Sequence, residues 1–319
     1  DFSRAGNWTE AATRWCERQS ISGFPGVCRV NRAEVMRLRG SWPEAEDELR
    51  TAVAELDEFA PSVAASAFYQ LGELQLRMGD LAAAEASFRQ AHGLGVDPQP
   101  GLALLHLANG EVEPARRGLR RALADQPRDR PSRARFLPAS VEISLAAGEI
   151  EEARVAAEEL AEIAQDYGTP ALAAHAAAAA GAVALAEEDA EAALRDLRRA
   201  IRLYQEVETP YEAADVRLLA AEAYRLDGDA DAAELELRAA QATFDRLGAM
   251  RDVRRAAEAL GRLAAKDGGE RAGRTFLYTD ICDSTPLVEA MGDEAWAGLV
   301  GWHDRTLRQL FGEYGGEEV

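Results

Sequence analysis

The sequence predicts a mainly α-helical protein, an α-solenoid of stacked helical hairpins, with a truncated α/β segment at the C-terminus. Three observations lead to this prediction. A short Gly-to-Ala pattern recurs along residues 1–265, 66 of the 319 residues are alanine, and the sequence changes character after residue 265. Alanine favours helix because its side chain loses no conformational entropy there. Repetition of one helical unit is typical of solenoids.

Length, charge and composition limit the class of protein. The chain is longer than one average domain, so more than one structural unit is expected. Its net charge of -20 disfavours binding to nucleic acid or to an anionic membrane surface. No apolar run is long enough to cross a membrane and no leader segment is evident, so we expect a cytoplasmic protein. Cys16, Cys28 and Cys282 lack zinc or disulfide spacing, and the single lysine, Lys266, has no Gly before it, which excludes a P-loop.

The repeating unit is a Gly followed five positions later by an Ala. The Gly is expected to end the first helix of a hairpin, where a positive φ is needed, and the small Ala allows the second helix to pack closely. Successive alanines are 31 to 40 residues apart, which fits one hairpin per interval. The copies are Gly6–Ala11, Gly40–Ala45, Gly79–Ala84, Gly110–Ala115, Gly148–Ala153, Glu188–Ala193 (with Glu in place of Gly) and Gly228–Ala233.

The apolar positions around these turns are typical of one repeat family. Large residues occupy one face of each predicted helix, and small residues stand where the helices cross. The residues are Phe68, Leu71, Gly72, Ala84, Phe88 and Ala91 in the clearest copy, Pro127 at the end of another, Tyr224 in a first helix, and Leu197, Ala200, Leu237 and Ala240 in second helices. This pattern resembles tetratricopeptide repeats. The resemblance implies a curved groove that binds a protein partner or connects other domains.

Eight arginines between residues 116 and 135 suggest two interpretations. They form either a basic stripe for phosphate or nucleic acid, or a solvated helix face and loop. The second is favoured because Phe136 is the only aromatic residue among them. They are Arg116, Arg117, Arg120, Arg121, Arg128, Arg130, Arg133 and Arg135.

Two other features of the repeat region have a functional and a structural interpretation. Residues 23–26, Gly-Phe-Pro-Gly, are either a ligand loop or a turn between helices. His92, His106 and His175 stand singly in separate repeats, so we expect surface or packing roles for them. The sequence therefore predicts no catalytic constellation within residues 1–265.

The last part of the chain has a different character. The composition of residues 266–273 is that of a linker, so the domains are expected at 1–265 and 274–319. Residues 274–281 are rich in β-branched and aromatic side chains and predict a strand. A short helix is expected at 287–291, and an amphipathic helix starting at Asp293 has its apolar face formed by Trp296, Leu299, Val300, His303, Leu307, Leu310 and Phe311. A second strand is expected to begin near residue 315.

The end of the predicted strand is a candidate metal and triphosphate site. Asp280 would provide a hard oxygen ligand for a divalent cation at the start of the turn that follows. Backbone N–H groups of Asp283, Ser284 and Thr285, at the N-terminus of a helix, would face phosphate oxygens. An Asp that simply caps a turn explains the same pattern equally well.

Four short segments at the C-terminus share their order with one known family: 276–285 (FLYTDICDST), 292–296 (GDEAW), 303–304 (HD) and 315–317 (GGE). They resemble the start of a class III adenylate/guanylate cyclase catalytic domain. The resemblance implies that Asp280 binds two ions of Mg²⁺ or Mn²⁺, that the backbone carbonyl of Ile281 adds a ligand, and that residues 282–285 lie beside the triphosphate of ATP or GTP. Cys282 and Asp283 replace the Val-Gly of many relatives.

The resemblance also defines what this chain lacks. The family's second Asp, its purine-selecting Lys and its later Asn and Arg lie beyond the point that matches Val319, so we expect the chain alone to be inactive. A complete domain would form a homodimer and convert ATP or GTP to a 3′,5′-cyclic nucleotide and pyrophosphate.

Three functions remain open from the sequence. The chain is part of a signalling nucleotidyl cyclase with a regulatory repeat region, an interaction scaffold with a degenerate cyclase segment, or the repeat region of a transcriptional regulator. A basic helix-turn-helix is missing from the sequence, which disfavours the last of these.

Overall fold

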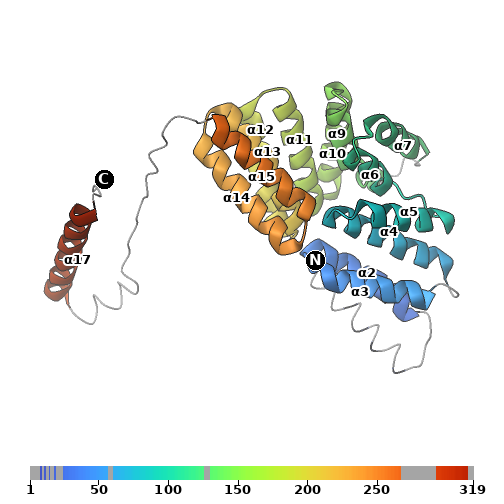
Figure 1. The fold of residues 1–319 in the computed structure, drawn as a ribbon, viewed down its shortest axis with the longest axis horizontal. Helices are drawn as coiled ribbons and strands as arrows, with labels where there is room; N and C mark the ends of the chain where they lie inside the picture. Colours follow the sequence, from blue (N-terminus) through green and yellow to red (C-terminus); the bar gives the residue numbers. More distant parts are fainter. Residues whose placement is uncertain are drawn as a thin grey trace. The chain divides into compact units, whose positions relative to one another are not determined.

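The computed structural model describes residues 24–56, 60–125, 130–266 and 292–314, together with Trp8, Ala11, Arg14 and Arg18. The chain divides into two compact units, Asp1–Gly268 and Gly269–Val319, which are considered separately here. All regular structure in the described ranges is α-helical (Figure 1).

Antiparallel hairpins build the first unit, as the repeat pattern predicts. Each consists of two consecutive helices packed along their length. The hairpins are α2 (Phe24–Arg39) with α3 (Trp42–Leu56), α4 (Pro61–Met78) with α5 (Leu81–Gly93), α6 (Gly101–Ala108) with α7 (Val112–Asp125), α9 (Leu137–Ala146) with α10 (Ile150–Tyr167), α11 (Pro170–Ala186) with α12 (Ala190–Glu206), and α13 (Pro210–Asp227) with α14 (Ala230–Leu247). The short α8 (Arg130–Ala134) precedes α9, and α15 (Met250–Lys266) follows the last hairpin.

The Gly-to-Ala prediction is confirmed for the copies that the structure describes completely. Their turn residues have positive φ, between 77° and 88° for the glycines and 61° for Glu188. The alanine five positions later is at most 1% exposed in each of them. The turn residues are Gly40, Gly79, Gly110, Gly148, Glu188 and Gly228, and the buried alanines are Ala45, Ala84, Ala115, Ala153, Ala193 and Ala233. Gly6 lies outside the described residues, and Ala11 is exposed.

The residue after the turn often caps the second helix. The carboxylates of Asp80, Asp189 and Asp229 accept hydrogen bonds from backbone N–H groups three residues later, at 2.9 to 3.0 Å. Such a cap satisfies a helix-terminal donor that has no partner within the helix. Asp80, Asp189 and Asp229, which directly follow their turn residues, therefore have a local structural role.

Two predictions near the domain ends have different outcomes. The interpretation of residues 23–26 as a turn or ligand loop is wrong for most of the segment, because α2 begins at Phe24 and includes Pro25 and Gly26. A proline in the first turn of a helix is tolerated since its missing N–H would have no helical partner.

At the C-terminus, the helix predicted from Asp293 is confirmed as α17 (Asp293–Tyr314).

Other predictions for the C-terminal segment lie outside the described residues. These are the strand at 274–281, the helix at 287–291 and the second strand from residue 315. The helix α15 ends at Lys266, and the rest of the predicted linker is also outside the described ranges. The α/β character of the segment therefore stays a prediction.

The solenoid of the first unit curls until its two ends meet (Figure 1). Helix α13 contacts α2, and α15 contacts α4. One buried apolar cluster contains Trp42 and Leu49 from α3 together with Phe244 and Leu247 from α14. The repeats therefore form a closed turn whose first and last hairpins share a core.

At some helix contacts a glycine occupies a position where a side chain would not fit. A Cβ atom added at Gly181 in α11 would lie 2.6 Å from Cγ and 3.1 Å from the backbone nitrogen of Leu197 in α12. Both distances are shorter than van der Waals contact, so α11 and α12 would have to move apart. By contrast, a Cβ atom at Gly261 in α15 would meet no atom within 4 Å.

We predict that Gly181→Ala and Gly261→Ala change stability in opposite directions. Gly181→Ala should destabilise the repeat unit by about 2 kcal/mol because it overpacks a close helix contact. Gly261→Ala should stabilise it by about 1 kcal/mol because alanine is the better helix former at an open position. Urea unfolding followed by circular dichroism measures both midpoints. Equal shifts in the same direction would contradict the helix contact at Gly181.

Candidate functional site

The predicted metal and triphosphate residues have no described geometry. Asp280, Ile281 and residues 282–285 all lie outside the described ranges. Among the residues that the structure does describe, no group of three or more His, Cys, Asp or Glu side chains is arranged to hold a metal ion. None of the described helices is long and apolar enough to span a membrane.

Four of the arginines between residues 116 and 135 pair with acidic residues of helix α10: Arg116, Arg120, Arg130 and Arg133. Arg116 and Arg120 both bind the carboxylate of Glu152, at 3.0 and 2.7 Å. Arg133 donates to Glu159, at 2.8 Å for its Nη2 atom. The hydrogen bond from Arg120 is the main reason that the pKa of Glu152 is lowered, with burial acting in the opposite direction.

The remaining members of this arginine group are mostly paired as well. Arg130 binds Glu162 at 2.8 Å, and Arg135 lies over the ring of Tyr69, with Cζ 4.5 Å from the ring centre. Arg121 lies 3.9 Å from Asp125, Arg117 donates to a backbone carbonyl, and Arg128 is outside the described residues. The expected solvated helix face is confirmed in part: Arg117, Arg120 and Arg121 are exposed, whereas Arg116 and Arg133 are partly buried in ion pairs between helices. Most of the group's charge is neutralised within the fold.

Two of the isolated histidines have structural partners. His106 Nδ1 lies 2.6 Å from a carboxylate oxygen of Glu111, next to the turn between α6 and α7. His175 Nδ1 lies 2.7 Å from the hydroxyl of Tyr204, and burial lowers the pKa of this histidine. Both contacts agree with the packing roles expected from the sequence.

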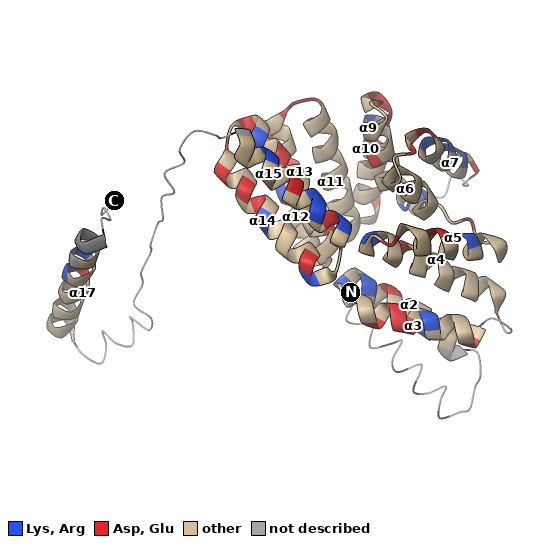
Figure 2. Ribbon diagram, in the orientation of Figure 1, with Lys and Arg blue, Asp and Glu red and all other residues tan. Residues whose placement is uncertain are grey.

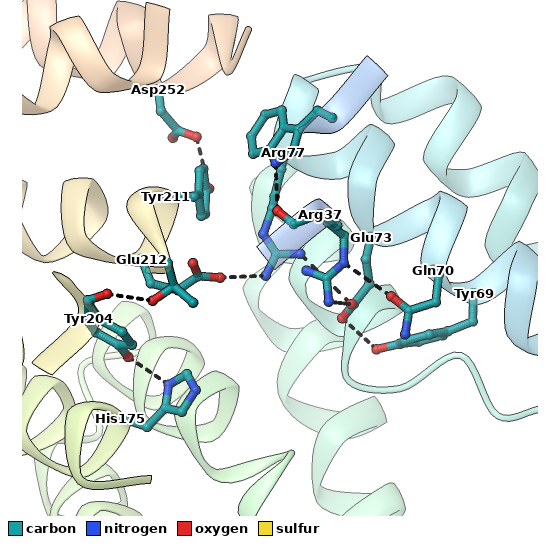
Figure 3. Close-up of polar contacts among 12 residues, drawn as sticks. Arg37, Tyr69, Gln70, Glu73, Arg77, His175, Tyr204, Tyr211, Glu212 and Asp252 are labelled. Atoms are coloured by element: carbon teal, nitrogen blue, oxygen red, sulfur yellow. Dashed lines mark hydrogen bonds and ion pairs between the residues drawn. The ribbon is translucent and has the colours of Figure 1, made fainter. Parts of the chain in front are cut away.

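A polar network crosses the contact between the two ends of the solenoid (Figure 3). On the N-terminal side, Arg37 in α2 is 6% exposed and binds Glu73 in α4 at 3.2 Å. The hydroxyl of Tyr69 donates to the same carboxylate at 2.8 Å. Burial raises the pKa of Glu73, whereas the charges of Arg37 and Arg77 lower it. The net shift is downward, so the carboxylate is ionised.

Arg77 carries the network to the C-terminal helices. Its guanidinium binds Glu212 of α13 at 3.4 Å and lies over the ring of Tyr211, with Cζ 5.2 Å from the ring centre. Tyr211 also packs against Trp42, with ring centres 5.6 Å apart. The residues of this closure network are Arg37, Tyr69, Gln70, Glu73, Arg77, Tyr211, Glu212 and Asp252.

Asp252 anchors the last helix, α15, to this network. Its carboxylate is 3% exposed and accepts hydrogen bonds from the Tyr211 hydroxyl at 3.0 Å and from Arg255 at 2.7 Å. Arg255 also approaches Asp215 at 3.4 Å. Burial and the neighbouring Asp252 raise the pKa of Asp215, while Arg255 opposes this shift.

Glu142 of α9 is close enough to Asp215, Arg255 and Arg251 for their charges to affect its carboxyl group. Burial among the surrounding groups is the main reason that the pKa of Glu142 is raised to about 7, and the negative charge of Asp215 adds to the shift. The Glu142 side chain is nevertheless accessible to solvent. Arg255 and Arg251 act in the opposite direction. The carboxyl groups of Glu142, Asp215 and Asp252 therefore lie close enough to Arg251 and Arg255 to interact with their charges. These residues come from α9, α13 and α15, so the pKa values depend on helices that are distant in sequence.

An apolar groove of about 520 Å³ lies between α13 and α15, with α14 as its floor. Helix α14 packs against both of its neighbours. The groove is lined by Leu218, Leu219, Ala221, Glu222, Arg225, Ala233, Leu237, Arg255, Glu258, Ala259, Arg262 and Leu263. We define these residues as the C-terminal groove. Its chemistry, an apolar centre with charged edges, fits a protein surface better than a small charged substrate.

The sequence alone did not identify the C-terminal groove or the closure network. The leucines of the groove follow an ordinary helical apolar period, and Arg77 and Glu212 are 135 residues apart. A possible signal is the four arginines of α15, which stand out in an acidic chain (Figure 2).

Comparison with known proteins defines the fold. No known family model matches the chain, and no curated protein does. A solved chain of the APC/C hetero-tetramer Cut9–Hcn1 is similar, with a TM-score of 0.56, 14% identity and 81% of this chain covered. The present chain spans 46% of that chain's length.

Two further solved structures have lower scores. A tetratricopeptide repeat protein from Parabacteroides merdae gives a TM-score of 0.40 at 15% identity, covering 74% of this chain and 97% of its own. The TPR2AB domain of yeast Sti1, in a complex named with pHSP90, gives 0.34 at 16% identity, covering 82% and 97%. The fold likeness rests on the first structure. Together with the confirmed turn pattern, it defines a solenoid of tetratricopeptide-like hairpins.

We predict that Glu73→Gln destabilises the helical unit by about 3 kcal/mol. The substitution leaves the buried Arg37 without its carboxylate partner, close to the like charge of Arg77. The matched control is Glu85→Gln, which removes an ion pair with Arg89 whose side chains are 59% and 71% exposed, and should change stability by less than about 0.5 kcal/mol. Unfolding in guanidinium chloride measures both variants, and similar losses for the two would show that the buried Arg37–Glu73 pair does not stabilise the unit.

Proposed function

We propose that the helical unit is a protein-interaction scaffold. The observation that carries the proposal is the C-terminal groove, which combines a partly exposed apolar centre with charged edges on three adjacent helices. Repeat solenoids typically use such extended surfaces for protein binding.

The electrostatics of the unit support protein rather than nucleic acid as the partner. The chain has a net charge of -20, and the arginines of residues 116–135 that the structure describes are mostly paired with acidic groups. A phosphate backbone would need free cations on one face, since it is neutralised by Lys and Arg contacts.

We expect the purified chain to bind one protein directly and saturably. A tagged full chain would isolate candidates from the cells in which it is expressed, and calorimetry with each purified candidate should give a dissociation constant in the micromolar range or below. The control is an unrelated helical protein of equal net charge, because binding through charge alone would occur with both. If no candidate binds directly above this control, the scaffold function is wrong.

A second candidate function rests on the sequence pattern of residues 276–285. We infer that the parent protein is a nucleotidyl cyclase, in which Asp280 and the carbonyl of Ile281 hold Mg²⁺ or Mn²⁺ and the segment Cys282, Asp283, Ser284, Thr285 lies beside the triphosphate. Two such ions would activate the ribose hydroxyl and stabilise the leaving pyrophosphate. The complete domain would act as a homodimer.

We predict metal-dependent formation of a cyclic nucleotide from ATP or GTP by a protein that carries the complete domain. Asp280→Ala should lower the rate at least about 100-fold, since it removes a ligand of the catalytic metal ions. Arg305→Ala, at an exposed position of α17, is the control and should keep most of the activity. Chromatography of the nucleotide products measures the rates. Equal activity of the two variants would exclude this role of Asp280.

A further inference from the structure

Glu142 of α9 belongs to a group of charges that three distant helices bring together. Its side chain is accessible to solvent, and within the described residues its carboxylate is assigned no ion pair and no hydrogen bond. The charges that act on it come from Asp215 of α13 and from Arg251, Asp252 and Arg255 of α15. We define these five residues as the α9–α13–α15 charge cluster.

Helix α11 packs against both α9 and α13 and adds no charge to this cluster. Its only polar side chain is His175, and the rest of the helix is mostly alanine. The His175 Nδ1 atom lies 2.7 Å from the hydroxyl of Tyr204, and burial lowers the pKa of the histidine, so it is neutral at pH 7. A helix without charge cannot compensate the carboxylates of its two neighbours, which therefore interact directly through space.

The other helices packed against α9, which are α6, α7, α8 and α10, pair most of their charges among themselves. The only titratable group of α6 is His106, which binds Glu111 at 2.6 Å. The arginines of α7 and α8 that have partners on a neighbouring helix bind acidic residues of α10; they are Arg116, Arg120, Arg130 and Arg133. The charges that govern Glu142 are therefore those of α13 and α15.

The cluster includes the group that anchors α15. Asp252, in the first turn of α15, is 3% exposed and accepts a hydrogen bond from the Tyr211 hydroxyl of α13 at 3.0 Å (Figure 3). Arg255 binds Asp252 at 2.7 Å and also approaches Asp215 at 3.4 Å. Arg255 is therefore shared between two carboxylates, and a third carboxylate nearby would compete for it.

The charge balance of the cluster depends on the protonation of Glu142. When Glu142 is neutral, the two carboxylates of Asp215 and Asp252 face two arginines. When Glu142 is ionised, a third negative charge is added close to Asp215. Burial is the main reason that the pKa of Glu142 is raised to about 7, and the charge of Asp215 adds to the shift. Both protonation states are therefore populated near neutral pH.

We propose that Glu142 is a pH-sensitive switch that controls how firmly α15 is held in the closed turn. In acidic solution the protonated carboxyl group leaves Arg255 to Asp215 and Asp252, and α15 stays anchored. In basic solution the carboxylate of Glu142 repels Asp215 and competes for the arginines, which weakens the anchor. Helix α15 is the last described helix before the second unit, so the switch acts on the end of the scaffold to which that unit is joined.

Hydrogen exchange of the full chain at different pH values tests the proposal. The closed form binds the Glu142 proton more tightly than the open form, so closure is favoured at low pH and loses this advantage as the pH rises through about 7. After correction for the intrinsic pH dependence of exchange, the opening equilibrium constant of α15 should increase about threefold to tenfold from about pH 6 to about pH 8. Solvent screening of an accessible carboxyl group sets the lower figure.

Glu142→Gln removes the titrating proton and keeps the shape of the side chain. In this variant the opening of α15 should stay at its low-pH value throughout the range. The matched control is Glu158→Gln, the same change at an exposed position of α10 outside the cluster, which should keep the pH dependence of the unmodified chain. The proposal is overturned if Glu142→Gln keeps that dependence or if Glu158→Gln loses it.

A second variant keeps Glu142 and changes its neighbour. Asp215→Asn removes the like charge and leaves Arg255 freer to interact with Glu142, so Glu142 should ionise at lower pH and α15 should open at lower pH. Carboxyl ¹³C NMR, with the Glu142 signal assigned from its absence in Glu142→Gln, follows the titration directly. An unchanged titration midpoint would contradict the switch. All of these measurements use the chain alone, so their outcome is independent of whether the helical unit binds a partner.

Discussion

The close approach of helices at small residues is the constraint on which the first unit depends. Each hairpin has a buried alanine five positions after its turn, and Gly181 allows α11 and α12 to approach until a methyl group would not fit. Such contacts bring whole helix surfaces into van der Waals range, where many weak attractions add up. The stacking of hairpins, the closed turn and the groove all follow from these short distances.

Closure of the turn converts local repeats into a single interdependent structure. In an open solenoid each repeat contacts only its neighbours. Here Arg77 of α4 contacts Tyr211 and Glu212 of α13, and Trp42 shares a core with Phe244. A change in an early hairpin can therefore affect the last helices.

The two candidate functions belong to different units and have different requirements. An interaction scaffold needs surface, and the helical unit provides an apolar groove edged by Glu258 and Arg262. A cyclase needs metal ligands and a complete catalytic domain, and its indications in this chain are the sequence segments 276–285, 292–296, 303–304 and 315–317. A regulatory repeat region joined to a catalytic domain would accommodate both, since partner binding and catalysis would then occur in one protein.

The sequence by itself determined the helical hairpins, because a turn with positive φ and its following cap are local events. The position of Glu188 shows this well, since the spacing predicted a turn there even without glycine, and its φ is 61°. The helix starting at Asp293 was equally predictable, whereas residues 23–26 were misread because a Gly-Phe-Pro-Gly segment is also compatible with a helix start. Only the tertiary structure decided that the solenoid closes, that Arg77 pairs with Glu212, and that the α13–α15 leucines form a groove. Those features depend on the small rotation of each hairpin relative to the next, added over all hairpins. The residue pattern of a single repeat does not determine this total rotation.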